Sequence, residues 1–471
     1  MADKIYDVAI VGSGPAGYTA AIRAGQFGLK TALIEKDNVL GGTCLHVGCI
    51  PTKALLFNAE IYDHLKDAAE FGIEGLGTPK LNWLKIQDRK DKIVTKHTKG
   101  LDFLMRKNKV DVIRGYGKLT GPAKNGVVTV DVDNGGAKSQ VQAKNVLLAS
   151  GSEARMISGL KPDDRILTNI EILSTKEIPK SLIVVGSGAV GVEFASIYNS
   201  FGTKVTVVEM LPRIVPVEDE EVSKELARVY RKRGIDVLTS AAVSKVEKTK
   251  TGVAVEVEVE GKTQRLEADK VLIAIGRRPR TENLGLEKTK VQTERGFVLV
   301  NEWLQTEEPN IYAIGDIVFG YPQLAHSGAM EGMVAVAKIA GKPAKPLNPL
   351  RIPNCTYCHP EIGSVGYTEA KAREKGLEIK VGKFPFTANS RASIVGAHEG
   401  FIKIVSDAKY GEILGVHIIG PNATELIAES VAAMEMEATV EDLMYTVHSH
   451  PTLSEGMRDA VESVYGLAID M

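Results

Sequence analysis

The sequence predicts an α/β protein with two parallel-sheet domains that carry inserted antiparallel layers, followed by a C-terminal α+β domain. Three observations support this prediction. A β-branched apolar run, a Gly-x-Gly-x-x-Gly motif and a helical stretch occur together twice, at Gly12 and again 174 residues later at Gly186. Glycine makes up 46 of the 471 residues, above the usual ~7%, which indicates backbone that turns tightly or approaches ligands. At ~150 residues a domain, the chain is long enough for about three buried cores.

The charge and hydropathy of the chain argue against several kinds of partner. Lys and Arg total 58 against 59 for Asp and Glu, and a net charge of -1 leaves no positive field for nucleic acid or anionic lipid. No apolar stretch approaches the ~18 residues of a membrane span, and the first strand-like run starts at Ile5, which leaves no room for a signal peptide. We expect no nucleic-acid partner, no membrane insertion and a cytoplasmic, bacterial location. An organelle matrix is the alternative if a transit peptide has been removed.

Each Gly-x-Gly-x-x-Gly motif lies between a predicted strand and a predicted helix. The glycines are Gly12, Gly14 and Gly17 in the first copy and Gly186, Gly188 and Gly191 in the second. Glu35 and Glu209 follow 18 residues after the last glycine of each copy, near the ~20 expected for a carboxylate that binds an adenosine ribose. Free N–H groups at the helix N-terminus would bind the phosphates. The sequence therefore predicts two Rossmann-like dinucleotide-binding domains. Because Glu209 would repel a 2'-phosphate, the second should bind NAD in preference to NADP.

Other segments predict the remaining layers and the domain boundaries. Residues 127–132 and 253–259 alternate in polarity between turns, which indicates antiparallel strands. The apolar runs 146–151 and 271–276 follow these layers and end in Gly, as strands returning to a nucleotide-binding sheet would. Past Pro343 come strands separated by Pro and an amphipathic helical region over 423–444. We predict a first domain over 1–146 that is completed by 277–345, a second over 147–276 and a third over 346–471, with a linker around 343–353.

Cys44 and Cys49 lie just after the first ribose carboxylate. On a regular helix they would be ~7.5 Å apart along the axis and ~140° apart around it, whereas a disulfide requires a Cα separation of ~4.4–6.8 Å. We therefore expect the helix to be distorted, with Gly48 supplying backbone freedom and Pro51 restraining the chain after the second cysteine. Two buried thiols without a reaction are the alternative. A thiol pair beside a phosphate loop and a helix N-terminus instead indicates disulfide exchange with a redox-active group.

The segment Gly-Gly-Thr-Cys-Leu-His-Val-Gly-Cys-Ile-Pro-Thr-Lys, residues 41–53, resembles the flavin-linked pyridine nucleotide-disulfide oxidoreductases. Within that family it is most similar to the members that oxidise a dihydrolipoyl group. His46 replaces a usual Asn and Thr52 a frequent Ser, but both cysteines and Lys53 are kept. The similarity covers essentially the whole chain, through ordered matches at residues 311–316, 324–326, 384–391 and 448–455.

The resemblance implies one FAD per subunit in the first domain, NAD in the second and dimerisation through the third. Asp316 would hydrogen-bond the flavin ribityl chain. Lys53 and Glu193 would form an ion pair near the reactive face of the flavin, where a cation stabilises the reduced ring. Further cofactor contacts are expected from Leu324, Ala325, His326, Gly42, Thr43, Gly117, Ser150, Gly151, Val243 and Gly276.

The resemblance also implies the reaction. His450, oriented by Glu455, would act as general base and reach the cysteine pair of the other subunit of a homodimer. Electrons would pass from a dihydrolipoyl group to Cys44 and Cys49, then to FAD and NAD+, with Cys44 exposed to substrate and Cys49 packed on the flavin. The partner would be the lipoyl domain of a 2-oxoacid dehydrogenase or glycine-cleavage complex. His448 has no nearby acidic residue in the sequence and is predicted to take no part.

Several alternatives are weaker. A glutathione-type disulfide reductase would typically carry Tyr at Ala189 and Ala at Gly191, and Glu209 argues against its NADP. A mercuric reductase would have cysteines near the C-terminus, a transhydrogenase would not need the cysteine pair, and a non-catalytic flavin-bearing subunit would need neither the pair nor the His–Glu element. The pattern Cys355-Thr-Tyr-Cys358-His fits a c-type haem motif. We predict structural thiols there, with a zinc half-site and haem as lesser alternatives, and no metal site.

Overall fold

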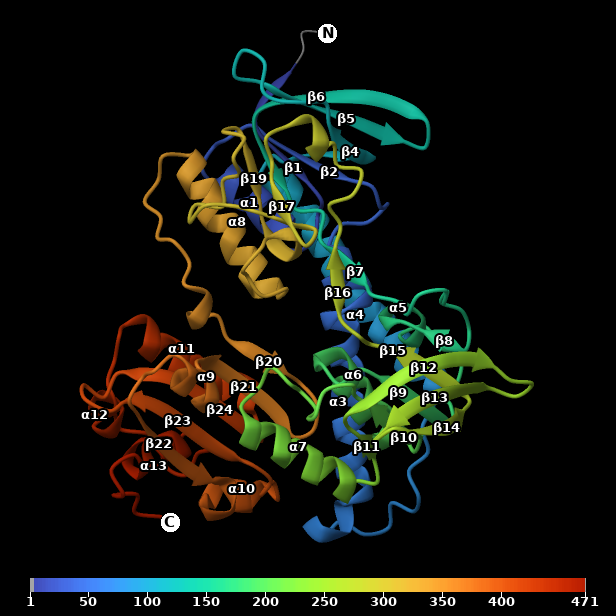
Figure 1. The fold of residues 1–471 in the computed structure, drawn as a ribbon, viewed down its shortest axis with the longest axis vertical. Coiled ribbons are helices and arrows are strands. Elements are labelled where there is room, and N and C mark those ends of the chain that lie inside the picture. The colour runs from blue at the N-terminus through green and yellow to red at the C-terminus, as the bar shows by residue number, and fades with distance from the viewer. Residues whose placement is uncertain (1–3, 471) are drawn as a thin grey trace. The chain divides into compact units, whose positions relative to one another are not determined.

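The computed structural model describes residues 4–470 and divides the chain into two compact units (Figure 1). The first unit runs up to Ala54 and continues over Gln87–Ala154 and Arg277–Pro349. The second unit comprises Leu55–Ile86, Arg155–Gly276 and the chain from Leu350 onward. Each unit is therefore assembled from three separate stretches of sequence.

The central sheet of the first unit contains β1 (Ile5–Val11), β2 (Thr31–Glu35), β3 (Asp111–Arg114), β4 (Tyr116–Leu119), β5 (Val128–Asn134), β6 (Ala137–Leu148) and β19 (Ile311–Ala313). The strand order is β3-β2-β1-β6-β5-β4, and β19 also pairs with β6. The pairs β1–β2, β1–β6, β2–β3 and β6–β19 are parallel, whereas β4 and β5 pair antiparallel. Strands β2 and β19 are buried throughout because both faces of the sheet are covered there.

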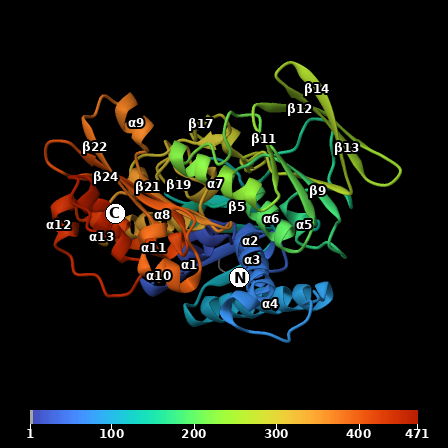
Figure 2. The ribbon, with the colours of Figure 1, turned by 90° about the horizontal axis from the view of Figure 1, so that it is seen from below.

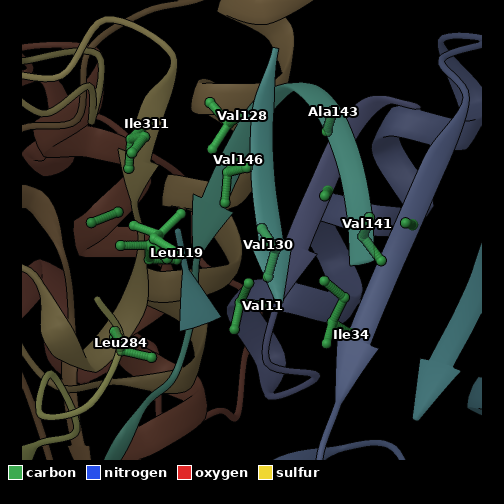
Figure 3. Close-up of a cluster of buried hydrophobic side chains, with 14 of the residues drawn as sticks. Val11, Ile34, Leu119, Val128, Val130, Val141, Ala143, Val146, Leu284 and Ile311 are labelled. Atoms are coloured by element: carbon green, nitrogen blue, oxygen red, sulfur yellow. The ribbon is translucent and has the colours of Figure 1, made fainter. Parts of the chain in front are cut away.

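Two apolar cores lie on the two faces of this sheet. Helices α1 (Pro15–Gln26), α4 (Trp83–Lys107) and α8 (Ala325–Ile339) contribute to one core, in which Leu33 and Leu147 are fully buried. The other core contains Val11, Ile34 and Val130 (Figure 3). The strand register aligns these side chains, since Val11 lies opposite both Ile34 and Leu148.

The second unit contains a parallel sheet of β8 (Ile166–Leu167), β9 (Ser181–Val185), β10 (Lys204–Val208), β11 (Asp236–Leu238) and β15 (Lys270–Ile273), in the order β11-β10-β9-β15-β8. An antiparallel layer of β12 (Ala241–Lys248), β13 (Val253–Val259) and β14 (Lys262–Ala268) accompanies it. Its helices are α5 (Asn169–Ile172), α6 (Ala189–Ser200) and α7 (Glu220–Lys232). The side chain of Asp219 caps α7 by accepting the Glu221 N–H.

An antiparallel sheet forms the C-terminal part of the second unit, in the order β20-β21-β24-β23-β22. Its strands are β20 (Asn354–Thr356), β21 (Glu361–Gly366), β22 (Ile379–Pro385), β23 (Phe401–Asp407) and β24 (Ile413–Gly420). The helices are α9 (Glu369–Glu374), α10 (Ser390–Val395), α11 (Ala423–Glu435), α12 (Val440–Met444) and α13 (Glu455–Ser463). Helix α11 packs on β21 and β24, and α13 packs on β22 and β23 (Figure 2).

The remaining elements are short or connect the units. Helix α2 (Gly42–Val47) precedes α3 (Cys49–Lys66), and β7 (Ser152–Ala154) pairs antiparallel with β16 (Arg277–Pro279). Strands β17 (Thr293–Glu294) and β18 (Phe297–Val298) form a hairpin, and 3-10 turns occur at Ala68–Phe71, Leu286–Lys288, Gly315–Ile317, Pro349–Arg351 and Phe386–Ala388. Within residues 4–470, no helix has the length and hydropathy needed to cross a membrane.

The predicted fold class is confirmed. The two repeats form β1-α1-β2 and β9-α6-β10 units, and the alternating segments form the antiparallel strands β5 and β13. The returning runs lie in β6 and β15, each parallel to the first strand of its repeat. The helical region over 423–444 consists of two helices, which are separated where Glu437 adopts a left-handed φ of 58°. The predicted domain boundaries stay predictions.

Candidate active site

The first nucleotide motif turns tightly between β1 and α1. A Cβ on Gly12 would lie 2.2 Å from the Ala149 carbonyl oxygen, and one on Gly17 would lie 1.9 Å from the Gly12 carbonyl oxygen. A Cβ on Gly14 would meet no atom within 4 Å. The outer glycines are therefore required for packing, while Gly14 leaves backbone open at the N-terminus of α1, as a bound pyrophosphate requires.

The second motif repeats this arrangement. A Cβ on Gly191 would lie 2.0 Å from the Gly186 carbonyl oxygen, whereas Gly188 faces open space. The two repeats also share a backbone hydrogen bond in the segment that follows the second strand of each. The Gly41 N–H donates to the Ser13 carbonyl at 3.0 Å, and the Val215 N–H, 174 positions later, donates to the Ser187 carbonyl at 3.1 Å.

A carboxylate lies at the end of the second strand in each repeat. Glu35 accepts the N–H and the hydroxyl of Ser13 at 2.8 and 2.6 Å. Glu209 accepts the N–H and the hydroxyl of Ser187 at 2.9 and 2.7 Å. Both glutamates are buried, and their remaining lone pairs can accept ribose hydroxyls. Each glycine motif and its carboxylate together form a site, called here a nucleotide cradle. Both cradles therefore fit an adenine dinucleotide without a 2'-phosphate.

The cysteine pair lies on either side of a helix break. Cys44 is in α2, Cys49 begins α3, and Gly48 between them has φ −142° and ψ −118°, outside the helical region. A Cβ on Gly48 would lie 2.9 Å from the Thr43 carbonyl oxygen. The helix is therefore distorted at Gly48, as the spacing of the cysteines predicted.

The pKa of the Cys44 thiol is set mainly by its neighbour Cys49. A hydrogen bond with Cys49, followed by burial, raises the pKa of the Cys44 thiol well above its usual value, and the charge of Lys53 opposes this only weakly. The Cys44 thiol therefore interacts directly with Cys49. Helix α2 is also seated on the first nucleotide motif, because a Cβ on Gly42 would lie only 2.8 Å from the Gly14 Cα. The thiol pair and the first phosphate cradle thus form one local structure.

Asp316 is held in the first unit by side chains that the sequence analysis did not identify. The Ser152 hydroxyl donates to the Asp316 carboxylate, and Arg277 donates to the same hydroxyl at 2.7 Å and to the Ser152 carbonyl at 2.8 Å. Burial is the largest influence on Arg277 and lowers the pKa of its guanidinium. Ser150 and Gly151 lie beside this network, since Arg280 donates its N–H to the Gly151 carbonyl and accepts the Ser150 hydroxyl.

Glu331 holds the same turn from α8. Its carboxylate accepts the Gly315 N–H at 2.6 Å and the Ser327 hydroxyl at 2.7 Å. Burial raises the pKa of Glu331 to about 7. The predicted contacts Leu324, Ala325 and His326 form the N-terminus of this helix, where N–H groups point outward.

The other predicted cofactor residues are placed in their own units. Thr43 is in α2, and Gly117 is buried in β4 of the first unit. Val243 lies in β12 and Gly276 follows β15, both in the second unit. Glu193, buried in α6, accepts the Tyr357 N–H at 3.0 Å within the second unit. Lys53 is in the first unit, so its ion pair with Glu193 stays a prediction.

His450 and Glu455 form a hydrogen-bonded pair in the second unit. His450 Nδ1 lies 2.9 Å from Glu455 Oε1, and the other carboxylate oxygen accepts the Thr452 N–H at 2.7 Å. Burial alone would raise the pKa of Glu455, but the Thr452 N–H and the His450 imidazole outweigh it and lower that pKa. Because a carboxylate only accepts, the Nδ1 of His450 carries the hydrogen and Nε2 is the basic nitrogen. The His450 side chain is 72% exposed, as a proton acceptor for an incoming group must be.

The prediction for His448 was wrong about its surroundings. His448 Nε2 lies 2.8 Å from Glu429 Oε1, and its Nδ1 lies 3.1 Å from the Thr446 carbonyl oxygen. Glu429 is in α11, 19 residues earlier in the chain. Sequence reasoning missed this partner because it considered only acidic residues next to the histidine.

The second cysteine pair is packed into the second unit. Cys358 is buried, and burial raises the pKa of its thiol. Cys355 Sγ lies 4.0 Å from the Thr424 carbonyl oxygen, and the His359 N–H donates to Ser196 in α6. Burial also lowers the pKa of the His359 imidazole to about 4. Among residues 4–470, no group of three or more His, Cys, Asp or Glu side chains is arranged to hold a metal ion.

Comparisons with known proteins identify the family. A family model described as pyridine nucleotide-disulphide oxidoreductase matches residues 6–332, and a model of that family's dimerisation domain matches residues 352–461. The chain belongs to this family. Its members are oxidoreductases that use FAD and NAD(H), which the two nucleotide cradles fit.

Full-length relatives and solved structures agree with this placement. A dihydrolipoyl dehydrogenase of Bacillus subtilis is 45% identical over 471 aligned residues, which cover 98% of this chain and 99% of the relative. A dihydrolipoyl dehydrogenase of Rhizobium etli is 45% identical, with 99% of each chain covered. The crystal structure of LpdA from Mycobacterium tuberculosis superposes with a TM-score of 0.89 at 28% identity, covering 97% of this chain and 98% of LpdA. The HOCl-induced flavoprotein disulfide reductase RclA of Escherichia coli gives 0.84 at 26% identity, covering 97% and 99%.

Proposed function

We propose that this protein is a dihydrolipoyl dehydrogenase, which oxidises protein-bound dihydrolipoamide to lipoamide and reduces NAD+ to NADH. The observation that carries the proposal is the hydrogen-bonded pair of Cys44 and Cys49, separated by the break at Gly48 and seated on the first nucleotide cradle. Relatives named dihydrolipoyl dehydrogenase that match the whole chain at 41–45% identity support this choice of substrate.

The domains and cofactor residues follow from the two repeats. We assign FAD to residues 1–146 and 277–345, NAD to 147–276 and dimerisation to 346–471. FAD would be held by Gly12, Gly14, Gly17, Glu35, Gly42, Thr43, Lys53, Gly117, Ser150, Gly151, Asp316, Leu324, Ala325 and His326. NAD would be held by Gly186, Gly188, Gly191, Glu209, Val243 and Gly276. Glu193 would instead form an ion pair with Lys53 near the reactive face of the flavin. When bound, FAD supplies the two-electron chemistry that connects a dithiol to a nicotinamide.

His450 acts as the base for the dithiol substrate. Glu455 fixes the hydrogen on Nδ1 and stabilises the positive charge that His450 acquires, so Nε2 removes a proton from a substrate thiol. This step is needed because a thiolate, and not a thiol, attacks a disulfide. The Thr452 N–H keeps the Glu455 carboxylate ionised and oriented.

The cysteine pair then exchanges bonds with the substrate. The substrate thiolate attacks Cys44, which forms a mixed disulfide and releases Cys49 as a thiolate. His450, which holds the first proton, then donates it to the departing Cys44 sulfur and takes the proton of the second substrate thiol. That second sulfur attacks the substrate sulfur of the mixed disulfide, which closes the lipoyl disulfide and releases Cys44 as a thiol. Two electrons have then passed to the cysteine pair, with one proton on Cys44 and one on His450. The raised pKa of Cys44 agrees with a proton on this sulfur.

The active site would be composite, with Cys44 and Cys49 from one subunit and His450 and Glu455 from the other. The dimerisation domain matched over residues 352–461 contains the His–Glu pair and supports a homodimer. The partner would be the lipoyl domain of a 2-oxoacid dehydrogenase or glycine-cleavage complex in the bacterial cytoplasm. A glutathione-type reductase is less well supported, because the buried Glu209 carboxylate would repel a 2'-phosphate.

Steady-state reduction of lipoamide by NADH, measured at 340 nm, tests the proposal. We expect turnover with NADH, little with NADPH, and none with oxidised glutathione. Replacing Cys44 with Ser should abolish lipoamide turnover while the protein keeps its flavin. Turnover in the Cys44→Ser variant would refute the disulfide relay, and turnover with glutathione and NADPH would favour the alternative reductase.

A further inference from the structure

A second imidazole–carboxylate pair lies two residues from His450. His448 contacts Glu429 of α11 through Nε2 at 2.8 Å and the Thr446 carbonyl through Nδ1 at 3.1 Å. The His448 side chain is 6% exposed, whereas that of His450 is 72% exposed. The two histidines of this segment therefore face opposite environments.

The contacts of His448 determine its charge. A neutral imidazole has one N–H donor and one acceptor nitrogen. A carboxylate and a backbone carbonyl can only accept, so both ring nitrogens of His448 must carry hydrogen to satisfy these two partners. The two contacts therefore favour the imidazolium form of His448, which can donate in both directions.

The segment that carries His450 depends on side-chain contacts for its order. Residues 445–454 connect α12 to α13 without regular structure. Across the described part of the chain, no backbone-to-backbone hydrogen bond involves residues 447–451. Tyr445 and Val447 are 84% and 95% exposed, so neither anchors the segment by burial. Leu453 and the Thr452 carbonyl, which accepts from Asn389, hold the C-terminal end of this stretch. On the other side of His450, the His448 side chain connects the stretch to helix α11.

We propose that His448 and Glu429 form a charged clamp that positions the loop carrying the general base His450. This inference rests on the proposed function and assigns both residues as positioning residues of its active site. The clamp acts on the backbone two residues before His450, while Glu455 orients the imidazole from the other side.

The clamp has a defined dependence on pH. The hydrogen bond with Glu429 is the largest influence and raises the pKa of His448, against burial and the charge of Arg458 from α13. Since the pKa is raised in the folded protein, the stabilisation is fully present below the ordinary value of ~6.5 and is lost as the pH rises through the folded value. Removing the Glu429 charge lowers that pKa, so the loop should loosen at a lower pH.

The test compares Glu429→Gln with the control Glu425→Gln, which removes a charge one turn earlier on the exposed side of α11. We expect Glu429→Gln to lower kcat for dihydrolipoamide by roughly ten- to a hundredfold, the range for a misplaced catalytic group. Oxidation of NADH by an artificial dye, which does not need His450, should stay unchanged. The variants His448→Gln and His448→Gln/Glu429→Gln should lose no more than Glu429→Gln alone, because the pair acts as one unit.

Hydrogen exchange of residues 445–454, corrected for intrinsic rates, provides a readout that does not use the reaction. Protection in the wild type should fall at alkaline pH, with a midpoint at lower pH in Glu429→Gln and an unchanged midpoint in Glu425→Gln. Equal exchange in all three proteins, or equal losses in the two variants, would overturn the clamp. If the wild type did not oxidise dihydrolipoamide, the proposed function would fail, while the exchange data would still decide whether the clamp exists.

Discussion

Replacing Lys403 with Met should strongly destabilise the second unit. Lys403 Nζ lies 3.0 Å from Asp219, 2.7 Å from Glu221 and 2.8 Å from Glu369. Burial alone would lower the pKa of Lys403, but the three carboxylates outweigh it and raise that pKa. The cluster joins β23 to the N-termini of α7 and α9, so its loss would affect three elements at once.

The magnitude follows from the exposure of each partner. Lys403 and Asp219 have side chains that are each 2% exposed, whereas Glu221 and Glu369 are 38% and 31% exposed. Solvent screens the last two, so they contribute little. Leaving Asp219 buried without its cation costs about 3–5 kcal/mol. At roughly 2–4 °C for each kcal/mol, the Tm should fall by roughly 6–20 °C.

Thermal unfolding of the FAD-loaded protein, followed by near-UV circular dichroism, measures this effect. The double variant Lys403→Met/Asp219→Asn should recover at least half of the lost stability, because it removes the unpaired charge as well as the cation. A fall of less than about 1 kcal/mol in the single variant, or no recovery in the double variant, would refute the reasoning.

Four further predictions concern single residues. Burial raises the pKa of Glu218 to about 7, so the folded state of the wild type loses stability as the pH rises toward 7. Glu218→Gln should therefore stabilise the protein by about 1–3 kcal/mol at pH 8 and leave its stability unchanged at pH 4. Equal effects on Tm at both pH values would contradict this. Glu331→Gln should weaken FAD retention, because it disturbs the hydrogen bond to Gly315. Flavin fluorescence during dialysis against a chaotrope measures the loss of FAD. Retention equal to that of the wild type would contradict this prediction. Glu209→Ala should raise the KM for NAD+ by roughly ten- to a hundredfold without changing that for lipoamide, and a parallel rise in both would indicate general damage. Gly48→Ala should lower stability by about 1–3 kcal/mol, because its Cβ would lie 2.9 Å from the Thr43 carbonyl oxygen; an unchanged Tm would show that the helix break does not need glycine.

The sequence predicted the parts of the molecule that are encoded by local spacing. The glycine motifs, the acidic residues after them and the break between Cys44 and Cys49 all follow from residues close together in the chain. Contacts between distant residues could not be predicted this way. Glu429 and His448 are 19 positions apart, and the link from Ser152 to Asp316 spans 164 positions. Arg277 could have been found, because it directly follows Gly276 at the end of a predicted returning strand.

The matched hydrogen bonds of Gly41 and Val215 lie at the point where the structures of the two repeats diverge. Up to that point both copies use the same backbone path and the same serine-to-glutamate bonds. Beyond it, one copy enters the short helix that bears Cys44 and the other proceeds to the capped start of α7. The cysteine pair therefore lies after Gly41, outside the part of the first repeat that matches the second. Protein engineers could look to the same junction when adding reactive groups to other members of this architecture.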